Sequence, residues 1–143
     1  AAVKLFELIH SVDRLSLAQA LNNAAARLGK VQDILLEVNV ALEASKSGVA
    51  LEDLEDLLRA CAALPHLRLR GLMAMPPWCP DPEEVRPYFR ALRQARDRLQ
   101  ALGLAGVELA ELSMGMSGDF EEAIEEGATL VRVGTALFGA RPH

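Results

Sequence analysis

The chain has 143 residues, of which 51% are hydrophobic and 24% charged, a composition typical of one globular domain spanning residues 1–143. Its formal net charge of −5 argues against partners that need a basic surface, namely nucleic acids and acidic membranes. The two cysteines lack a CxxC spacing and nearby histidine pairs, which excludes a disulfide framework and a zinc site. No apolar run approaches the roughly 20 residues that span a membrane, so we expect a cytosolic protein with free thiols.

Strand-like and helix-like segments alternate along the chain. Short runs rich in Ile, Leu and Val predict strands at residues 7–12, 33–40, 67–75, 110–114 and 130–133. Apolar residues at helical spacing, ended by glycine or proline, predict helices at residues 15–28, 51–64, 83–102 and 119–127. This alternation predicts right-handed crossovers and a parallel sheet built from about five β–α units.

Glycine and hydroxyl residues follow the last two predicted strands. The turn 115–118 comes after strand 110–114, and Gly134-Thr135 comes after strand 130–133. In parallel α/β sheets, ligands bind beyond the C-terminal strand ends. Glycine lets the backbone approach an anion closely, and the hydroxyls of Ser117 and Thr135 add donors, so the two turns predict a phosphate cradle. Either turn alone is a weak signal, because glycine-rich turns are ordinary in α/β proteins.

Arg132 is the charged residue of the otherwise apolar strand 130–133. An unpaired buried charge is strongly destabilising, so Arg132 needs either a ligand or an ion pair with a nearby glutamate, and both readings stay open. His10 is expected to be a packed, hydrogen-bonded residue rather than a base. Lys46 is either a solvated side chain or a loop cation near an anion.

Two further groups of residues have more than one interpretation. The charged runs at 52–59 and 83–98 are most simply exposed helix faces, although they could also cover a neighbouring subunit. Four methionines gather at two predicted strand ends, where they suit either a soft pocket wall or core filling. These are Met73, Met75, Met114 and Met116.

Short motifs run in order along nearly the whole chain. They are HSVDR at 10–14, VNV at 38–40, SKSG at 45–48, RGLMAM at 70–75, LSMGMS at 112–117, VRVGT at 131–135 and FGAR at 138–141. Together they resemble the motifs of the pyridoxal 5′-phosphate (PLP) homeostasis protein family, whose members have an alanine racemase N-terminal-domain-like barrel. The resemblance implies a (β/α)8 TIM barrel, of which this chain covers about the last five β–α units, strands 4 to 8, with the N-terminal strands missing.

The resemblance also implies the cofactor PLP and the residues that bind it. Arg132 would face the pyridine nitrogen, and an always-charged guanidinium there keeps that nitrogen unprotonated and weakens the ring as an electron sink. The phosphate would be held by Ser117 and by the backbone of Gly134 and Thr135. The ring would be bordered by Met73, Met114 and Met116.

The match departs from the family at the lysine that forms the imine with PLP. In the family this lysine lies on the first barrel strand, in a motif that is absent here, and Lys4, Lys30 and Lys46 do not match it. We therefore expect the lysine on the missing N-terminal part, which is cleaved, disordered or left out of this chain. Closure of the sheet by a second chain is the alternative.

The implied function is sequestration or delivery of PLP in vitamin B6 homeostasis, without catalytic turnover. A monomer or weak dimer is expected, with PLP-dependent apoenzymes as the partners that receive the cofactor. The alternative is a PLP-dependent amino-acid racemase of the alanine racemase class, which needs a tyrosine base from an additional β-domain. The only tyrosine, Tyr88, starts a surface-type helix. A phosphate-binding domain for another metabolite would require the motif match to be coincidental.

Overall fold

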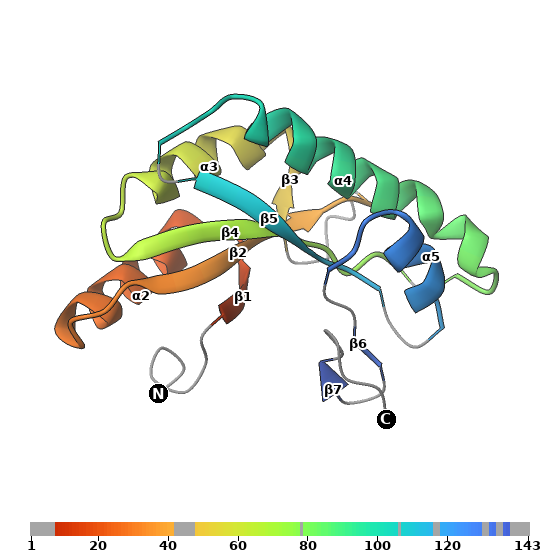
Figure 1. Ribbon diagram of the computed structural model, residues 1–143, viewed down its shortest axis with the longest axis horizontal. Helices are drawn as coiled ribbons and strands as arrows, with labels where there is room; N and C mark the ends of the chain where they lie inside the picture. The colour runs from red at the N-terminus through yellow and green to blue at the C-terminus, as the bar shows by residue number, and fades with distance from the viewer. Residues whose placement is uncertain are drawn as a thin grey trace.

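The computed structural model describes residues 8–41, 48–77, 79–105, 107–115, 118–129, 132–133 and 136–137. In chain order its strands and helices are β1 (Leu8–Val12), α2 (Leu15–Arg27), β2 (Gln32–Asn39), β3 (Val49–Ala50), α3 (Leu54–Ala62), β4 (Leu67–Met73), α4 (Arg86–Gln100), β5 (Val107–Ser113), α5 (Phe120–Glu125), β6 (Arg132–Val133) and β7 (Ala136–Leu137). Short 3-10 turns, Leu51–Asp53 and Pro82–Glu84, lead into α3 and α4. The predicted alternation of strands and helices is confirmed as far as α5 (Figure 1).

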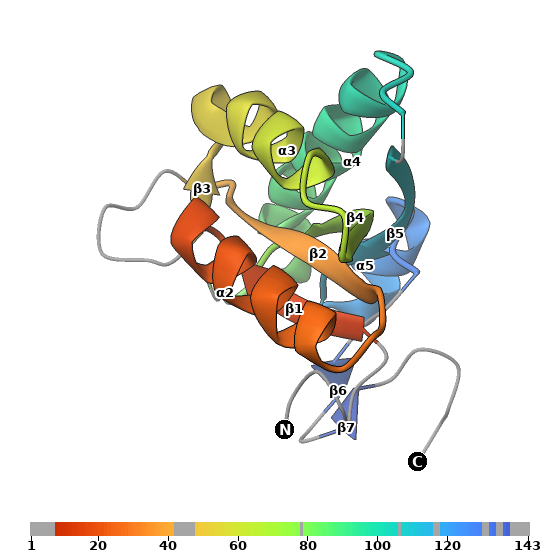
Figure 2. The same ribbon diagram turned by 90° about the vertical axis from the view of Figure 1, so that its left-hand side faces the viewer.

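The main sheet is parallel, with the strand order β1-β2-β4-β5 and with β3 paired to β2. Helices α2, α3 and α4 lie on one face of this sheet, and the β6–β7 pair lies beyond the other face (Figure 1, Figure 2). The predicted parallel α/β sheet is therefore confirmed for these strands. Because its strands run in the same direction, their C-terminal ends meet at one edge.

The helix-facing side of the sheet forms the hydrophobic core. Leu36, Leu72 and Leu112 pair laterally across β2, β4 and β5, and all three are fully buried. They belong to the same apolar cluster as Leu58 of α3 and Phe89 of α4. Burying a side chain of this size contributes about 1.5 to 3 kcal/mol, so this layer fixes the helices on the sheet.

The opposite face of the sheet carries a second set of laterally paired residues. At its C-terminal end, Glu37, Met73 and Ser113 pair across β2, β4 and β5, and all three are buried. None of them belongs to the helix-side cluster, as expected for side chains that alternate between the two faces of a strand. This row is the layer nearest the strand ends on the face turned away from the helices.

The end of the chain differs from the prediction. Residues 130–133 were expected to form a fifth parallel strand, but Arg132 and Val133 pair antiparallel with Leu137 and Ala136 in a separate two-stranded sheet. That expectation is wrong for the described part of the segment, residues 132–133. Only two residues separate β6 from β7, and so short a connection joins antiparallel rather than parallel strands.

Smaller differences concern where strands begin and end. Strand β4 ends at Met73 rather than Met75, which is 47% exposed and stands before Pro76, a residue without the N–H that a ladder needs. Strand β5 begins at Val107, before the predicted start at residue 110. The two-residue strand β3 was not predicted, since it lies directly before a helical pattern.

Candidate functional site

The candidate site is the edge where β2, β4 and β5 end, which the glycine turns and the strand-end methionines predicted. Met73 is the last residue of β4 and is 1% exposed, between Glu37 of β2 and Ser113 of β5. It lies on the face turned away from the helices. Met114 follows β5 and is 2% exposed, but it belongs to the helix-side core cluster. The structure thus brings Met73 to the predicted edge and packs Met114 into the core.

The other predicted site residues are described in part or lie outside the described residues. Arg132 is placed by its backbone in β6, and its side chain lies outside the description, as does that of His10 in β1. The residues outside the described ranges are Lys46, Met116, Ser117, Gly134 and Thr135. Their roles stay predictions.

The first predicted turn begins with a glycine in an unusual backbone conformation. Gly115 has φ +100°, a value that glycine adopts readily and other residues rarely. Asp119, the predicted first residue of the helix, occupies the N-cap position of α5, and Gly127 ends the helix region with φ +106°. The chain therefore leaves β5 through a glycine turn and enters a short helix, as the sequence predicted.

Thr129 fastens the segment after α5 to the end of β5. Its Oγ1 accepts a hydrogen bond from Leu112 N at 2.9 Å, and its own N–H donates to Leu112 O at 2.8 Å. Its hydroxyl also lies 3.3 Å from Leu112 O as a donor. This contact holds Thr129 against the end of β5. Sequence reasoning missed Thr129, although a hydroxyl residue directly after the end of a helix was a usable signal.

Three motifs that the sequence singled out separately meet where β1 and β2 end. Gly48 N donates to Asp13 Oδ2 at 3.0 Å, which joins the motif after β1 to the motif before β3. Gly48 has φ +109°, and a Cβ there would lie 2.7 Å from Asn39 N. Any other residue at position 48 would be strained by the positive φ, and its Cβ would clash with the backbone of Asn39. The glycine is therefore needed for this close approach. The loop ahead of it, residues 42–47, lies outside the described residues.

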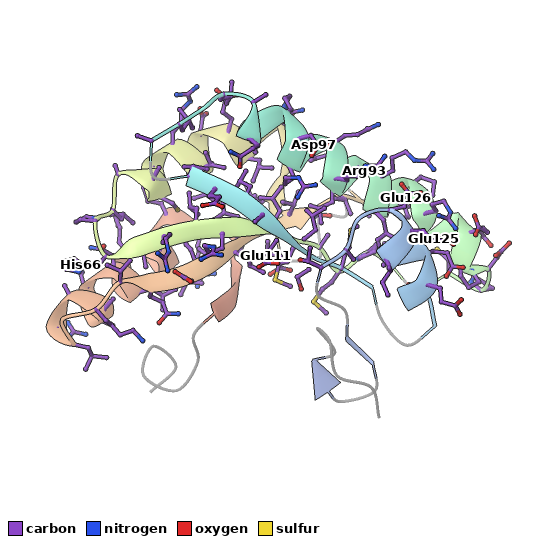
Figure 3. The ribbon with its side chains drawn as sticks, in the orientation of Figure 1. His66, Arg93, Asp97, Glu111, Glu125 and Glu126 are labelled. Atoms are coloured by element: carbon purple, nitrogen blue, oxygen red, sulfur yellow. The ribbon has the colours of Figure 1, made fainter. Side chains whose placement is uncertain are left out.

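A buried carboxylate docks α5 onto α4. Glu126 is 6% exposed and accepts hydrogen bonds from Arg86 at 3.1 Å and from Arg90 at 3.1 Å, and it forms an ion pair with Arg93 at 3.1 Å (Figure 3). The Arg90 guanidinium, helped by Arg86 and Arg93, holds the pKa of Glu126 below its usual range, against the opposing effect of burial. Arg86 also pairs with Glu125 at 2.7 Å.

The charged run of α4 is therefore more than the exposed helix face that was expected. Several of its arginines are used between α4 and α5, on a carboxylate that is itself buried. Arg86 additionally pairs with Glu83 at 2.7 Å, and this hydrogen bond lowers the pKa of Glu83. The network joins the C-terminal end of α5 to α4, and none of its residues belongs to the strand-end edge.

A second charged cluster lies at the other end of the sheet. Asp33 accepts from Arg68 Nε at 2.7 Å and from an Arg70 guanidinium N–H at 3.4 Å. Asp33 and Arg68 stand near the starts of β2 and β4 and pair in register, far along the strands from Met73. The hydrogen bond to Asp33 raises the pKa of Arg68. We assign this cluster to the stability of the sheet, because ligands bind at the opposite strand ends.

Both cysteines are free, as the sequence predicted. Cys61 is buried in α3, and this burial raises the pKa of its thiol to about 11. Cys79 is half-buried in the loop after β4, and burial is the main cause that raises its pKa as well. Among the residues that the structure describes, no group of three or more His, Cys, Asp and Glu side chains is arranged to hold a metal ion. Within the same residues, no helix has the length and apolarity needed to cross a membrane.

Comparison with known proteins gives relatives of high identity. A curated pyridoxal phosphate homeostasis protein of Aquifex aeolicus is 52% identical over 136 residues, which are 95% of this chain and 59% of that protein. The structure of PipY from Synechococcus elongatus with PLP bound is 38% identical, with a TM-score of 0.83, and the match covers 96% of this chain and 63% of PipY. PipY without PLP gives a TM-score of 0.85 at the same identity, covering 96% of this chain and 64% of PipY.

These matches fix the family and limit what can be carried over. The chain spans about three fifths of the length of the curated relatives it matches. The sequence model of the family "Alanine racemase, N-terminal domain" matches residues 1–142, nearly the whole chain. The parallel sheet of this chain, with helices on one face, agrees with the alanine racemase-like α/β fold. The chain belongs to the alanine racemase N-terminal domain family.

Proposed function

We propose that this chain binds PLP at the C-terminal edge of its sheet and serves PLP homeostasis in the cytosol, holding or delivering the cofactor without catalytic turnover. The observation that carries the proposal is the contact between Thr129 and Leu112. Leu112 and Thr129 each stand shortly before one of the two turns that we predict to bind phosphate, so their contact supports placing both turns at one edge. Two glycine turns at one edge, with backbone N–H groups and hydroxyls, would form a suitable anion site.

The names of the relatives support this choice of ligand. The relatives in Aquifex aeolicus and Escherichia coli are called pyridoxal phosphate homeostasis proteins, and PipY was solved with PLP bound. We infer that β1, β2, β4 and β5 correspond to strands 4 to 7 of a (β/α)8 barrel. Residues 1–143 would then be a single domain that forms part of a PLP-binding barrel.

The residues present fit PLP at this edge. Ser117 and the backbone of Gly134 and Thr135 would hold the phosphate, and the positive φ of Gly115 supports a tight turn just before Ser117. Met73 would border the ring, since it lies in the buried row nearest the strand ends. Met116 and Met114 complete the proposed border, although Met114 would have to turn away from the helix-side core to make this contact.

Arg132 gives a physical reason for binding without turnover. PLP, when bound, supplies a ring that can withdraw electrons from an attached amine, most strongly when its pyridine nitrogen is protonated. Arg132 facing that nitrogen would hold it unprotonated, because a guanidinium remains charged and donates hydrogen bonds only. The role of this chain's residues is then to bind and orient the cofactor. The proposal also includes PLP-dependent apoenzymes as recipients of the cofactor and a chain that is a monomer or a weak dimer.

The racemase alternative finds no support in the position of the only tyrosine. Tyr88 lies in the first turn of α4, half-buried, and packs against the helix-side core. A base must reach the ligand at the strand-end edge on the other face of the sheet. Tyr88 is therefore poorly placed to act as a catalytic base at this edge.

Two variants test the proposed site through different properties of the bound cofactor. Arg132→Ala should change the absorbance spectrum of bound PLP and its dependence on pH, because the pyridine nitrogen loses its charged neighbour. Ser117→Ala should keep the spectrum and weaken binding about fivefold, the effect of losing one hydrogen bond worth about 1 kcal/mol. Ser16→Ala, at an exposed position of α2, is the control and should titrate as the wild type does. Titrations of Arg132→Ala and Ser117→Ala that coincide with the wild type would contradict the assignment.

A further inference from the structure

Both backbone groups of Leu109 in β5 are bonded to side chains of α4. The N–H of Leu109 donates to Gln100 Oε1 at 2.6 Å, and its C=O accepts from an Arg96 guanidinium N–H at 3.2 Å. Leu109 lies where the register between β4 and β5 shifts, and it pairs with no residue of β4 in the described register. Two side chains of one helix thus serve the backbone of a strand residue that the β4 ladder does not.

Among the strands that the structure describes, β5 is the last of the main sheet, with β4 on one side only (Figure 1). The N–H of Ala74 donates to Ser113 O at 3.0 Å, so Ser113 faces β4 and the neighbouring Leu112 presents its N–H and C=O to the outer edge. Thr129 takes up both groups, accepting from Leu112 N at 2.9 Å and donating to Leu112 O at 2.8 Å. The edge of β5 is therefore occupied at Leu112 by Thr129 and at Leu109 by α4.

The side chains that bond to Leu109 come from a helix that is fixed independently of them. Leu92 and Leu99 of α4 are fully buried in the helix-side core, so α4 keeps its place without these hydrogen bonds. Arg96 is also held by Asp97, whose carboxylate accepts from its Nε at 2.7 Å. An open strand edge is a template for pairing with another chain, because its N–H and C=O groups lack partners. An incoming strand at Leu109 would have to displace groups that are already in position.

We propose that Gln100 and Arg96 form an edge cap, which keeps β5 from pairing with β5 of a second copy of this chain. Two copies would meet about a twofold axis, so the groups freed at Leu109 in each chain would be offered to the other. With the edge cap in place, a further strand can join β5 only from Leu112 onward, where Thr129 already lies. The inference is independent of PLP binding, because neither capping residue belongs to the strand-end edge.

The test compares two double variants of the 143-residue chain that carry the same substitutions on the same helix. Gln100→Leu with Arg96→Leu removes the edge cap, and Gln94→Leu with Arg98→Leu, at exposed positions of α4, is the matched control. In sedimentation velocity over a concentration series, the uncapped variant should associate at about tenfold lower protein concentration than the wild type, the order expected when freed backbone groups pair again. The control should associate as the wild type does. Gln100→Glu, which keeps an acceptor for Leu109 N, should also match the wild type.

Amide hydrogen exchange at Leu109 shows whether the association uses this edge. In dilute samples of the uncapped variant the amide should exchange faster than in the wild type, and it should slow again at concentrations where the variant associates. Equal association of the two double variants would overturn the proposal, as would association that leaves the Leu109 amide unprotected. Lower stability without association would overturn it as well, because the two side chains would then only tie α4 to β5. If circular dichroism shows that the uncapped variant does not fold, Gln100→Leu against Gln94→Leu makes the same comparison.

Discussion

Gly71 shows how one residue decides the spacing of the sheet beneath the candidate site. It lies in β4 opposite Glu111 of β5, where the register between the two strands shifts. A Cβ built at Gly71 would collide with the backbone carbonyl oxygen of Glu111. Backbone atoms cannot move aside as a flexible side chain can, so β4 and β5 reach their positions only because residue 71 has no side chain.

We therefore expect Gly71→Ala to destabilise the fold by about 3 kcal/mol, at the upper end of the usual cost of overpacking a tight site. Chemical denaturation followed by circular dichroism measures this free energy of unfolding. Gly118→Ala is the matched control, because a Cβ at Gly118 meets no atom within 4 Å. Equal stability of the two alanine variants would show that β4 and β5 are farther apart than the structure places them.

At the scale of elements, α5 connects the two turns of the candidate site and is held by charge as well as by apolar packing. Glu126 is the acceptor shared by Arg86, Arg90 and Arg93 on α4. Its neighbour Glu125 forms one ion pair with Arg86, and its side chain is 64% exposed. A buried carboxylate with several partners contributes more than an exposed ion pair, which water and salt screen.

Glu126→Gln should lower the free energy of unfolding by about 1 to 3 kcal/mol at pH 7, since charge-assisted hydrogen bonds are lost at a buried position. Glu125→Gln should leave it nearly unchanged, because the exposed pair is screened by solvent. Thermal and urea unfolding of the two variants measure the difference. The reverse order of stability would contradict the docking of α5 through Glu126.

The stabilities of the wild type and of Glu126→Gln should depend differently on pH. The pKa of Glu126 is lowered in the folded chain, so its contribution is complete above the unfolded pKa of about 4.3 and disappears as the pH falls through the folded pKa. The stability gap between the wild type and Glu126→Gln should therefore narrow between about pH 5 and pH 3. A gap that stays constant over this range would mean that Glu126 does not titrate in its ion network.

The helices and strands also show which features of the structure could be predicted from the sequence. The helix ends at Gly29, Gly103 and Gly127 were predicted, and all three glycines have positive φ. Local signals of this kind need only neighbouring residues, which is why they succeed. The close approach at Gly71 and the burial of Glu126 depend on residues from other elements, so nothing in the local pattern distinguished them from an ordinary strand glycine and an exposed glutamate.

The prediction of a parallel strand at residues 130–133 failed for a related reason. Leu130 to Val133 has the composition of a strand, and composition predicts a strand without naming its partner. Pairing of β6 with β7 comes from the two-residue connection between them, while Thr129 keeps a contact with β5. The apolar pattern of Met73 and Met114 was equally ambiguous, because a strand sends neighbouring residues to opposite faces. The motif order, by contrast, predicted the family correctly.

At the scale of the whole molecule, the two faces of the sheet have different roles. The helix-side face is a continuous apolar core, and the other face carries Glu37, Met73 and Ser113 near the strand ends. The charged cluster of Asp33, Arg68 and Arg70 lies toward the strand starts. A parallel α/β sheet with the proposed binding residues at its C-terminal edge and a charged, stabilising cluster at the other end follows the general plan of such folds.

The central claim is that this edge binds PLP through its phosphate, and a PLP titration of the 143-residue chain tests it most directly. The titration is repeated with inorganic phosphate as competitor and followed by borohydride reduction and intact mass. We predict saturable binding that phosphate competes away, with no site-specific adduct on Lys4, Lys30 or Lys46. Absence of saturable binding, or binding that phosphate does not affect, would contradict the claim. A stable adduct on one of these lysines would show that the chain supplies its own imine lysine.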